Sequence, residues 1–248
     1  MSKIKHLRKD EQQIELLFNG AFTENKPIAF PNRSGTTAYS NLFYWAHLVA
    51  HETAEFPLHP HEGFEIMTFV FKGSVEHFDT ASKVYTPLNE GDVQAIQAGS
   101  GVSHSERITK GTELFQIWFD PDFSKTLKQE ATYKDYEQKS FHSVSDEAKE
   151  TLVYVGEGGS VNTITEGLGV KKTTFKRGVF SEALDPEFTY SYYLLDGEMY
   201  LDGETLLKDD FYVLKDAKSV SFKVENDAEL FVIKTPTDVS YRRFIERY

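Results

Sequence analysis

Two stretches of this chain repeat one order of strands and turns about 120 residues apart, and this repeat constrains the fold more than any other feature. Each copy contains a strand, a turn that ends in glycine, a second strand, a turn with aspartate and a third strand. The copies cover residues 69–96 and 192–214. Because several parts recur in the same order, we interpret the chain as two copies of one β-unit.

The composition agrees with a β-rich chain, since 20 Phe and 13 Tyr are residues that favour strands and helix signals are few. Residues 66–71 and 74–79 are predicted to pair as a hairpin. Residues 93–97 and 113–119 are predicted to form two further strands. Together, these patterns predict an all-β fold.

The polar stretch at residues 121–145 is poor in aliphatic side chains and is predicted to be a crossing between two domains. The predicted domains are residues 1–135, which contain all the chemistry-bearing motifs, and residues 136–248. A second strand-rich block begins near residue 152.

Charge and composition exclude several classes of function. A net charge of −12 argues against a protein that coats nucleic acid or an anionic membrane. No apolar stretch is long enough for a membrane span, and the first residues lack the apolar core of a signal peptide. There are no cysteines, so we expect neither disulfides nor thiolate chemistry, and we expect a cytoplasmic location.

Four potential metal ligands occur as two pairs with a spacing of two residues: His59 with His61, and His104 with Glu106. On a strand, residues with this spacing point to the same face. Two such strands that face each other across a small barrel would direct three imidazoles and one carboxylate at one point. These donors suit a divalent first-row metal better than calcium or magnesium.

All eight histidines lie at or before His142, so the second β-unit has none. We therefore predict one metal per chain, in the N-terminal domain. The second unit would serve structure, pocket walls or partner contacts.

With these residues identified, the chain resembles the pirin family, whose members are two-domain cupins. The family's first motif is present as the seven residues from His59 to Glu65. Its second motif is present as Gly91-Asp92-Val93-Gln94, followed by the nine residues from Ala98 to Glu106. The resemblance is specific over residues 41–120 and is carried only by the pattern of strands over residues 150–235.

The resemblance implies a bicupin, with two jelly-roll β-barrels packed face to face and one metal in the N-terminal barrel. It assigns the metal ligands to His59, His61, His104 and Glu106. Iron is the expected metal, and Mn, Ni, Cu or Zn would also suit these ligands. Some pirins resemble quercetinases, which open flavonols with O2, whereas others act as iron-dependent transcriptional co-regulators.

This chain departs from the family pattern at Glu62, where members often have arginine, and at Gln97, where the general cupin motif has proline. Glu65 occupies the position of a carboxylate ligand in ordinary cupins and is interpreted as a supporting residue. His77 is interpreted as a hydrogen-bonded core residue, and Asp92 as a residue that fixes a turn.

Two functions of different classes follow. The first is a metal-dependent dioxygenase that acts on a small enolic or aromatic substrate with O2, with Glu106 as the base that takes the substrate hydroxyl proton. The second is a non-enzymatic, iron-dependent regulatory protein that binds a protein partner. A scavenger of a small molecule is a third possibility, and the sequence does not decide among them.

Overall fold

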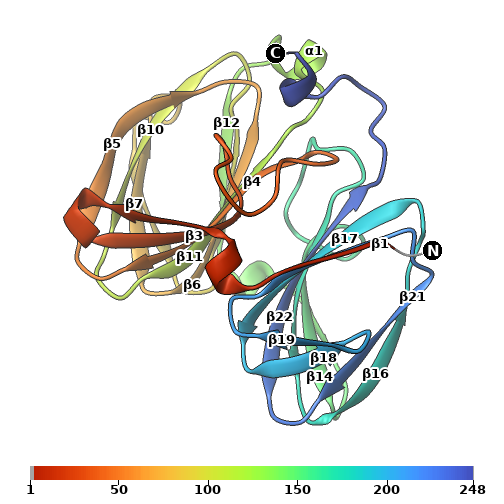
Figure 1. The fold of residues 1–248 in the computed structure, drawn as a ribbon. Helices are drawn as coiled ribbons and strands as arrows, with labels where there is room; N and C mark the ends of the chain where they lie inside the picture. Colours follow the sequence, from red (N-terminus) through yellow and green to blue (C-terminus); the bar gives the residue numbers. More distant parts are fainter. Residues whose placement is uncertain (1–2, 248) are drawn as a thin grey trace. The chain divides into compact units, whose positions relative to one another are not determined.

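The computed structural model describes residues 3–247, which divide into two compact units built almost entirely from strands (Figure 1). The first unit contains residues 12–140 and 240–247, and the second contains residues 3–11 and 141–239. The predicted all-β fold is confirmed. None of the helices in residues 3–247 is long and apolar enough to cross a membrane.

The first unit has a seven-stranded sheet with the order β12-β9-β6-β11-β4-β3-β2 and a four-stranded sheet with the order β5-β10-β7-β8. Its strands are β2 (Gln13–Leu17), β3 (Phe22–Ile28), β4 (Leu42–Ala50), β5 (Ala54–His61), β6 (Glu65–Lys72), β7 (Ser74–Asp79), β8 (Tyr85–Asn89), β9 (Val93–Gln97), β10 (Val102–Ile108), β11 (Glu113–Phe119) and β12 (Thr132–Tyr136). Its short helices are η2 (Phe18–Gly20), α1 (Phe123–Thr126), η3 (Gln138–Ser140) and η4 (Phe244–Glu246).

The second unit repeats this arrangement, with a seven-stranded sheet β1-β20-β17-β22-β15-β14-β13 and a four-stranded sheet β16-β21-β18-β19. Its strands are β1 (Lys3–Leu7), β13 (Ser143–Ser145), β14 (Lys149–Val155), β15 (Gly169–Phe175), β16 (Gly178–Ala183), β17 (Phe188–Asp196), β18 (Glu198–Leu201), β19 (Glu204–Leu207), β20 (Phe211–Lys215), β21 (Ser219–Val224) and β22 (Ala228–Pro236). Its one named helix within the described residues is η1 (Lys9–Glu11).

The units differ from the sequence-based division into residues 1–135 and 136–248. Residues 3–11 belong to the second unit, and residues 240–247 belong to the first. Strand β1 pairs antiparallel with β20 and forms the edge of the second unit's large sheet. Near the other end, the Phe244 backbone N–H donates to the Asp120 carboxylate of the first unit, at 2.6 Å. These long-range pairings leave no local pattern in the sequence, and a division by continuous segments therefore differs from the observed units.

The predicted hairpin of residues 66–71 with residues 74–79 is wrong. Strand β6 pairs with β9 and β11 in the large sheet, whereas β7 pairs with β8 and β10 in the small sheet. Gly73 between them has φ +78, and an added Cβ would lie 2.5 Å from the Thr112 hydroxyl. Gly197 occupies the same place between β17 and β18, with φ +84. The glycine therefore permits the chain to change sheets, and a short turn between two strands looks the same in sequence as a hairpin.

The stretch at residues 121–145 is also more ordered than its polar composition predicts. It contains α1 and then β12, which pairs antiparallel with β9 over Thr132–Tyr136 and extends the first unit's large sheet. Its lysines, glutamates and glutamines suit a solvated edge strand. The crossing into the second unit is confined to its end, near residue 140.

The interiors of the two units differ. In the second unit, buried apolar side chains form one large cluster, which includes Tyr192, Leu201 and Phe222. In the first unit, buried apolar side chains form smaller clusters, one around Phe22 and Leu48 and another around Phe43 and Phe64. A cavity of about 260 Å³ lies in the first unit, lined by β2, β3, β4, β5, β10 and β11.

Candidate metal centre

Three of the four predicted ligands come together on two neighbouring strands of the first unit. Strands β5 and β10 pair antiparallel, with His104 opposite His59. The spacing of two residues places His61 on the same face of β5 as His59. The prediction that the two strands face each other across a barrel is wrong, because they are hydrogen-bonded neighbours in one sheet. The site is thus a largely buried cluster across two neighbouring strands of one sheet.

The imidazoles are close enough to share one ion. The potential ligand atoms of His59, His61 and His104 all lie within 4.8 Å of one another. The Nε2 atoms of His61 and His104 are 3.0 Å apart, and the ring centroids of His59 and His104 are 4.4 Å apart.

The electrostatic setting keeps the His61 and His104 rings neutral, as metal binding requires. Burial, together with the neighbouring histidines, lowers the pKa of His61 and of His104 from 6.5 to about 3. The Nδ1–H of His59 donates to the Pro57 carbonyl at 2.8 Å, which leaves its Nε2 as the atom with a free lone pair. The three side chains therefore fit a divalent first-row metal.

Glu106 is buried beside this cluster but is not one of the three residues that meet the metal-site distances. A register shift between His104 and Glu106 places Glu106 opposite Phe56 on β5. Its carboxylate accepts two hydrogen bonds from the Gln116 amide, at 3.1 and 3.0 Å. Burial raises the pKa of Glu106, while His77 and the Gln116 hydrogen bonds oppose this shift.

Gln116 and Trp118 complete the support of this carboxylate, and sequence reasoning missed both. The Trp118 indole N–H donates to the Gln116 side-chain oxygen at 3.0 Å, which leaves the Gln116 amide nitrogen directed at Glu106. The Trp118 ring also meets the His61 ring edge-on, with centroids 4.7 Å apart. Both residues lie on β11, where their spacing of two was the only available signal.

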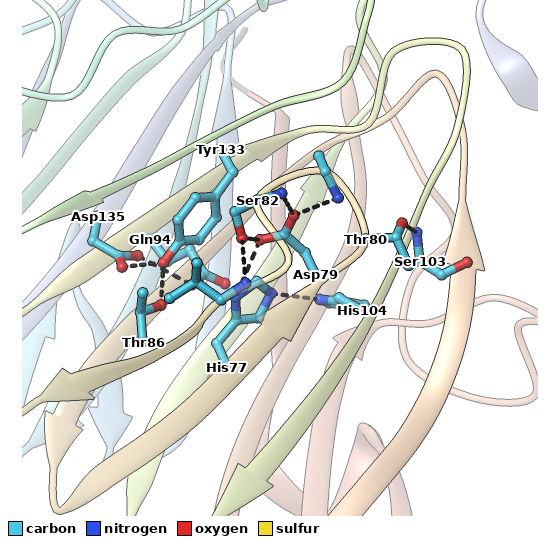
Figure 2. A network of polar contacts seen from close by, with 12 residues as sticks. His77, Asp79, Thr80, Ser82, Thr86, Gln94, Ser103, His104, Tyr133 and Asp135 are labelled. Carbon is cyan, nitrogen blue, oxygen red and sulfur yellow. Dashed lines mark hydrogen bonds and ion pairs between the residues drawn. The ribbon is translucent and has the colours of Figure 1, made fainter.

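A second set of contacts holds His104 from the other side (Figure 2). His77 Nε2 lies 3.2 Å from His104 Nδ1, and His77 Nδ1 lies 4.0 Å from the Asp79 carboxylate. The Tyr133 ring stacks on His77 at a centroid distance of 5.1 Å. With His104 Nε2 directed at a metal, Nδ1–H would donate to His77. The interpretation of His77 as a buried, hydrogen-bonded residue agrees with this arrangement.

Two other sequence interpretations also agree with the geometry. Glu65 is fully buried and accepts a hydrogen bond from Gln97 at 3.2 Å, so it has a supporting position within the sheet. Asp92 accepts from the backbone N–H groups of Asn89 and Gln138, at 2.9 Å each, and fixes the turn before β9.

Two β-units of one topology, with a single three-histidine cluster among the described residues, define a cupin-type protein with a site for a divalent metal. Residues 28–119 match the Pirin family. A putative quercetin 2,3-dioxygenase of Zymomonas mobilis is 27% identical over 186 residues, which is 73% of this chain and 76% of that protein. The predicted resemblance to the pirin family is confirmed.

Solved structures show the same fold. A bacterial pirin of Escherichia coli in complex with nickel(II) superposes with a TM-score of 0.79 at 20% identity, over 96% of this chain and all (100%) of that one. A quercetin 2,3-dioxygenase of Acinetobacter baumannii has a TM-score of 0.82 at 20% identity, over 96% of this chain and 88% of that one. The bicupin fold is therefore shared over nearly the whole chain.

Proposed function

We propose that this protein is an iron-dependent dioxygenase that opens flavonol-like or other enolic aromatic substrates with O2. The observation that carries the proposal is a cavity shared by His59, His61 and the buried carboxylate of Glu106. The names of the Zymomonas and Acinetobacter relatives support this choice of chemistry.

His59, His61 and His104 would hold the metal, and Glu106 would be either a fourth ligand or the base. Divalent iron, when bound there, supplies the redox and Lewis-acid chemistry that the reaction of an enol with O2 needs. Mn, Ni, Cu and Zn suit the same ligands, and the metal that restores activity to metal-free protein identifies the native one.

The protein itself prepares a proton acceptor. Glu106 takes the proton of the substrate hydroxyl on a carboxylate oxygen, and its raised pKa makes it a stronger base than an exposed glutamate. Gln116 holds both carboxylate oxygens, so the group keeps its orientation before and after the transfer. Aromatic side chains of the cavity, such as Phe56 and Trp118, exclude water and pack against a flat substrate.

The test is O2 uptake by the iron-loaded protein with quercetin, compared with iron-loaded Glu106→Gln. Loss of the base should reduce the rate by about 10²–10⁴-fold. The matched control is Glu65→Gln, another buried carboxylate of the same unit, which should retain most activity. Equal rates for the wild type and Glu106→Gln would remove Glu106 as the base.

Absence of turnover across flavonols and catechols, with iron confirmed in the protein, would overturn the enzyme proposal. The function would then be that of an iron-dependent regulatory protein with a protein partner. For either function, we propose a cytoplasmic location.

A further inference from the structure

The cavity at the candidate metal centre is also lined by a group of charged and polar side chains, on strands that carry no predicted site residue. Glu15 on β2, Glu24 and Lys26 on β3, and Tyr44 on β4 line this cavity together with His59 and His61. We call these four side chains the polar wall.

The polar wall is held together by short contacts. Lys26 Nζ lies 2.7 Å from a Glu15 carboxylate oxygen and 2.6 Å from a Glu24 carboxylate oxygen. The side chains of Lys26 and Glu24 are each only 9% exposed. The Tyr44 hydroxyl donates to Glu24, and the Gln13 amide donates to Glu15 at 2.6 Å.

This arrangement is costly for a β-sandwich interior. Glu15 and Glu24 lie directly opposite each other on paired antiparallel strands, where like charges destabilise the sheet. Burial of an ion pair stabilises a fold less than apolar packing of the same volume does. The second unit has the same topology and contains a large apolar cluster. A role in binding accounts for retaining charged groups on the cavity wall.

The charged groups that line the cavity indicate which functional groups a ligand should have. The polar wall has two carboxylates and one ammonium, and Glu106 adds a third carboxylate to the lining. No arginine is among the lining residues in the described part of the chain. Two carboxylates offer about eight acceptor positions, of which Lys26, Tyr44 and Gln13 use four. Spare acceptors favour ligand O–H groups.

A negatively charged ligand would be disfavoured in the same place. Burial already raises the pKa of Glu24, with Lys26 opposing the shift, and the charge of Glu106 raises it further. An added carboxylate would therefore meet a site in which negative charge is unfavourable.

We propose that the polar wall is a recognition subsite for hydroxyl groups on a neutral aromatic ligand, and that it disfavours aromatic carboxylates. The inference deepens the proposed function and rests on it for the identity of the bound substrate. The hydroxyls in contact with the polar wall would be distant from the enol that reacts.

The first test measures affinity without turnover. Zinc-loaded protein, which is redox-inert, is titrated with quercetin and with 3-hydroxyflavone, which has the same enol but lacks the other hydroxyls. Hydrogen bonds to charged groups should make quercetin bind at least about 10-fold more tightly. Glu24→Leu/Lys26→Leu removes one charge of each sign, and this preference should be lost while zinc content is retained.

The matched control removes an ion pair of the second unit, Lys171 with Glu182, whose nitrogen and oxygen lie 2.8 Å apart. Lys171→Leu/Glu182→Leu should keep the preference for quercetin. Equal affinity of wild type for the two flavonols, or a preference that survives in Glu24→Leu/Lys26→Leu, would overturn the subsite.

The second test separates the subsite from the proposed function. Metal-free protein is titrated with resorcinol and with benzoate, a neutral diol and an anion of similar size, and binding is followed by NMR. Selective binding of resorcinol, lost in Glu24→Leu/Lys26→Leu, would support the subsite even if flavonols were never turned over. Binding of benzoate at least as tight as that of resorcinol, or no binding of either, would overturn it.

Discussion

The two units of this protein share a topology strand for strand but use the interior differently. Strand β12 in the first unit and β1 in the second occupy the same edge, although one lies mid-chain and the other at the N-terminus. In the small sheets, Glu106 lies opposite His77, four residues after Gly73, and Phe222 lies opposite Leu201, four residues after Gly197. Phe222 is therefore the counterpart of Glu106.

The same register assigns the other counterparts. Two residues before Glu106 is His104, paired with His59, and two residues before Phe222 is Val220, paired with Glu182. The second unit thus has the apolar Val220 and Phe222 where the first has His104 and Glu106, while Glu182 occupies the position of His59. One set of strand pairings therefore accommodates both interiors.

The largest expected effect is in the second unit. Phe222→Ala removes a large side chain that is only 2% exposed, and it should lower the free energy of unfolding by about 3–5 kcal/mol. Urea denaturation measures this change. Metal bound per folded molecule should be unaltered, because none of the predicted ligands lies in this unit. Loss of metal from the folded variant would show that the second interior contributes to the site.

The next effect is in the first unit. Loss of a residue that only supports a metal ligand reduces metal affinity by about 10–100-fold, and His104→Ala, which removes a ligand, should reduce it further. The circular dichroism spectrum of this variant should be unchanged. His59→Ala and His61→Ala should reduce metal affinity to a similar extent.

The control is Val220→Ala, at the position in the second unit that corresponds to His104, and this variant should retain all metal. Elemental analysis should give at most one equivalent per wild-type chain, and two tightly bound equivalents would contradict the comparison.

The sequence predicted the features that recur locally. Alternation marked β9, and the spacing of two placed His59 and His61 on one face of their strand. It could not show that β6 and β7 part into different sheets, since a turn at Gly73 has the same composition in both cases.

The polar wall was missed for a related reason. Glu15, Glu24 and Lys26 are charged residues on strands near the N-terminus, and such residues are usually solvated. Only the pairing of β2 with β3, and their position over the cavity, shows that these side chains face inward. Interior charge is a property of tertiary structure, and the local pattern does not contain it.

A smaller effect is expected from His77, whose counterpart in the second unit is Leu201. His77→Phe keeps a ring beside Tyr133 but removes the nitrogen that lies 3.2 Å from His104 Nδ1. Metal affinity should fall by about 10–100-fold, as is usual when the partner of a ligating histidine is lost. Competition with a metal chelator measures the change. Unaltered affinity in His77→Phe would show that His104 needs no partner, and Tyr133→Phe is the control that retains His77.

The smallest effect is the pH dependence of the metal-free protein, and its sign follows from the buried histidines. The folded-state pKa of His61 and of His104 is about 3, whereas the ordinary value is 6.5. Between these values the unfolded chain binds more protons than the folded protein. The stability contributed by the neutral rings is therefore complete above pH 6.5 and is lost as the pH falls. Each histidine adds at most about 1.4 kcal/mol per pH unit to the slope of the unfolding free energy against pH.

His61→Gln and His104→Gln should each flatten this slope between pH 6 and pH 5, as measured by urea denaturation. His142→Gln, at an exposed position of the second unit, should not change it. An unchanged slope in both of the first two variants would mean that folding does not lower the pKa of these two histidines.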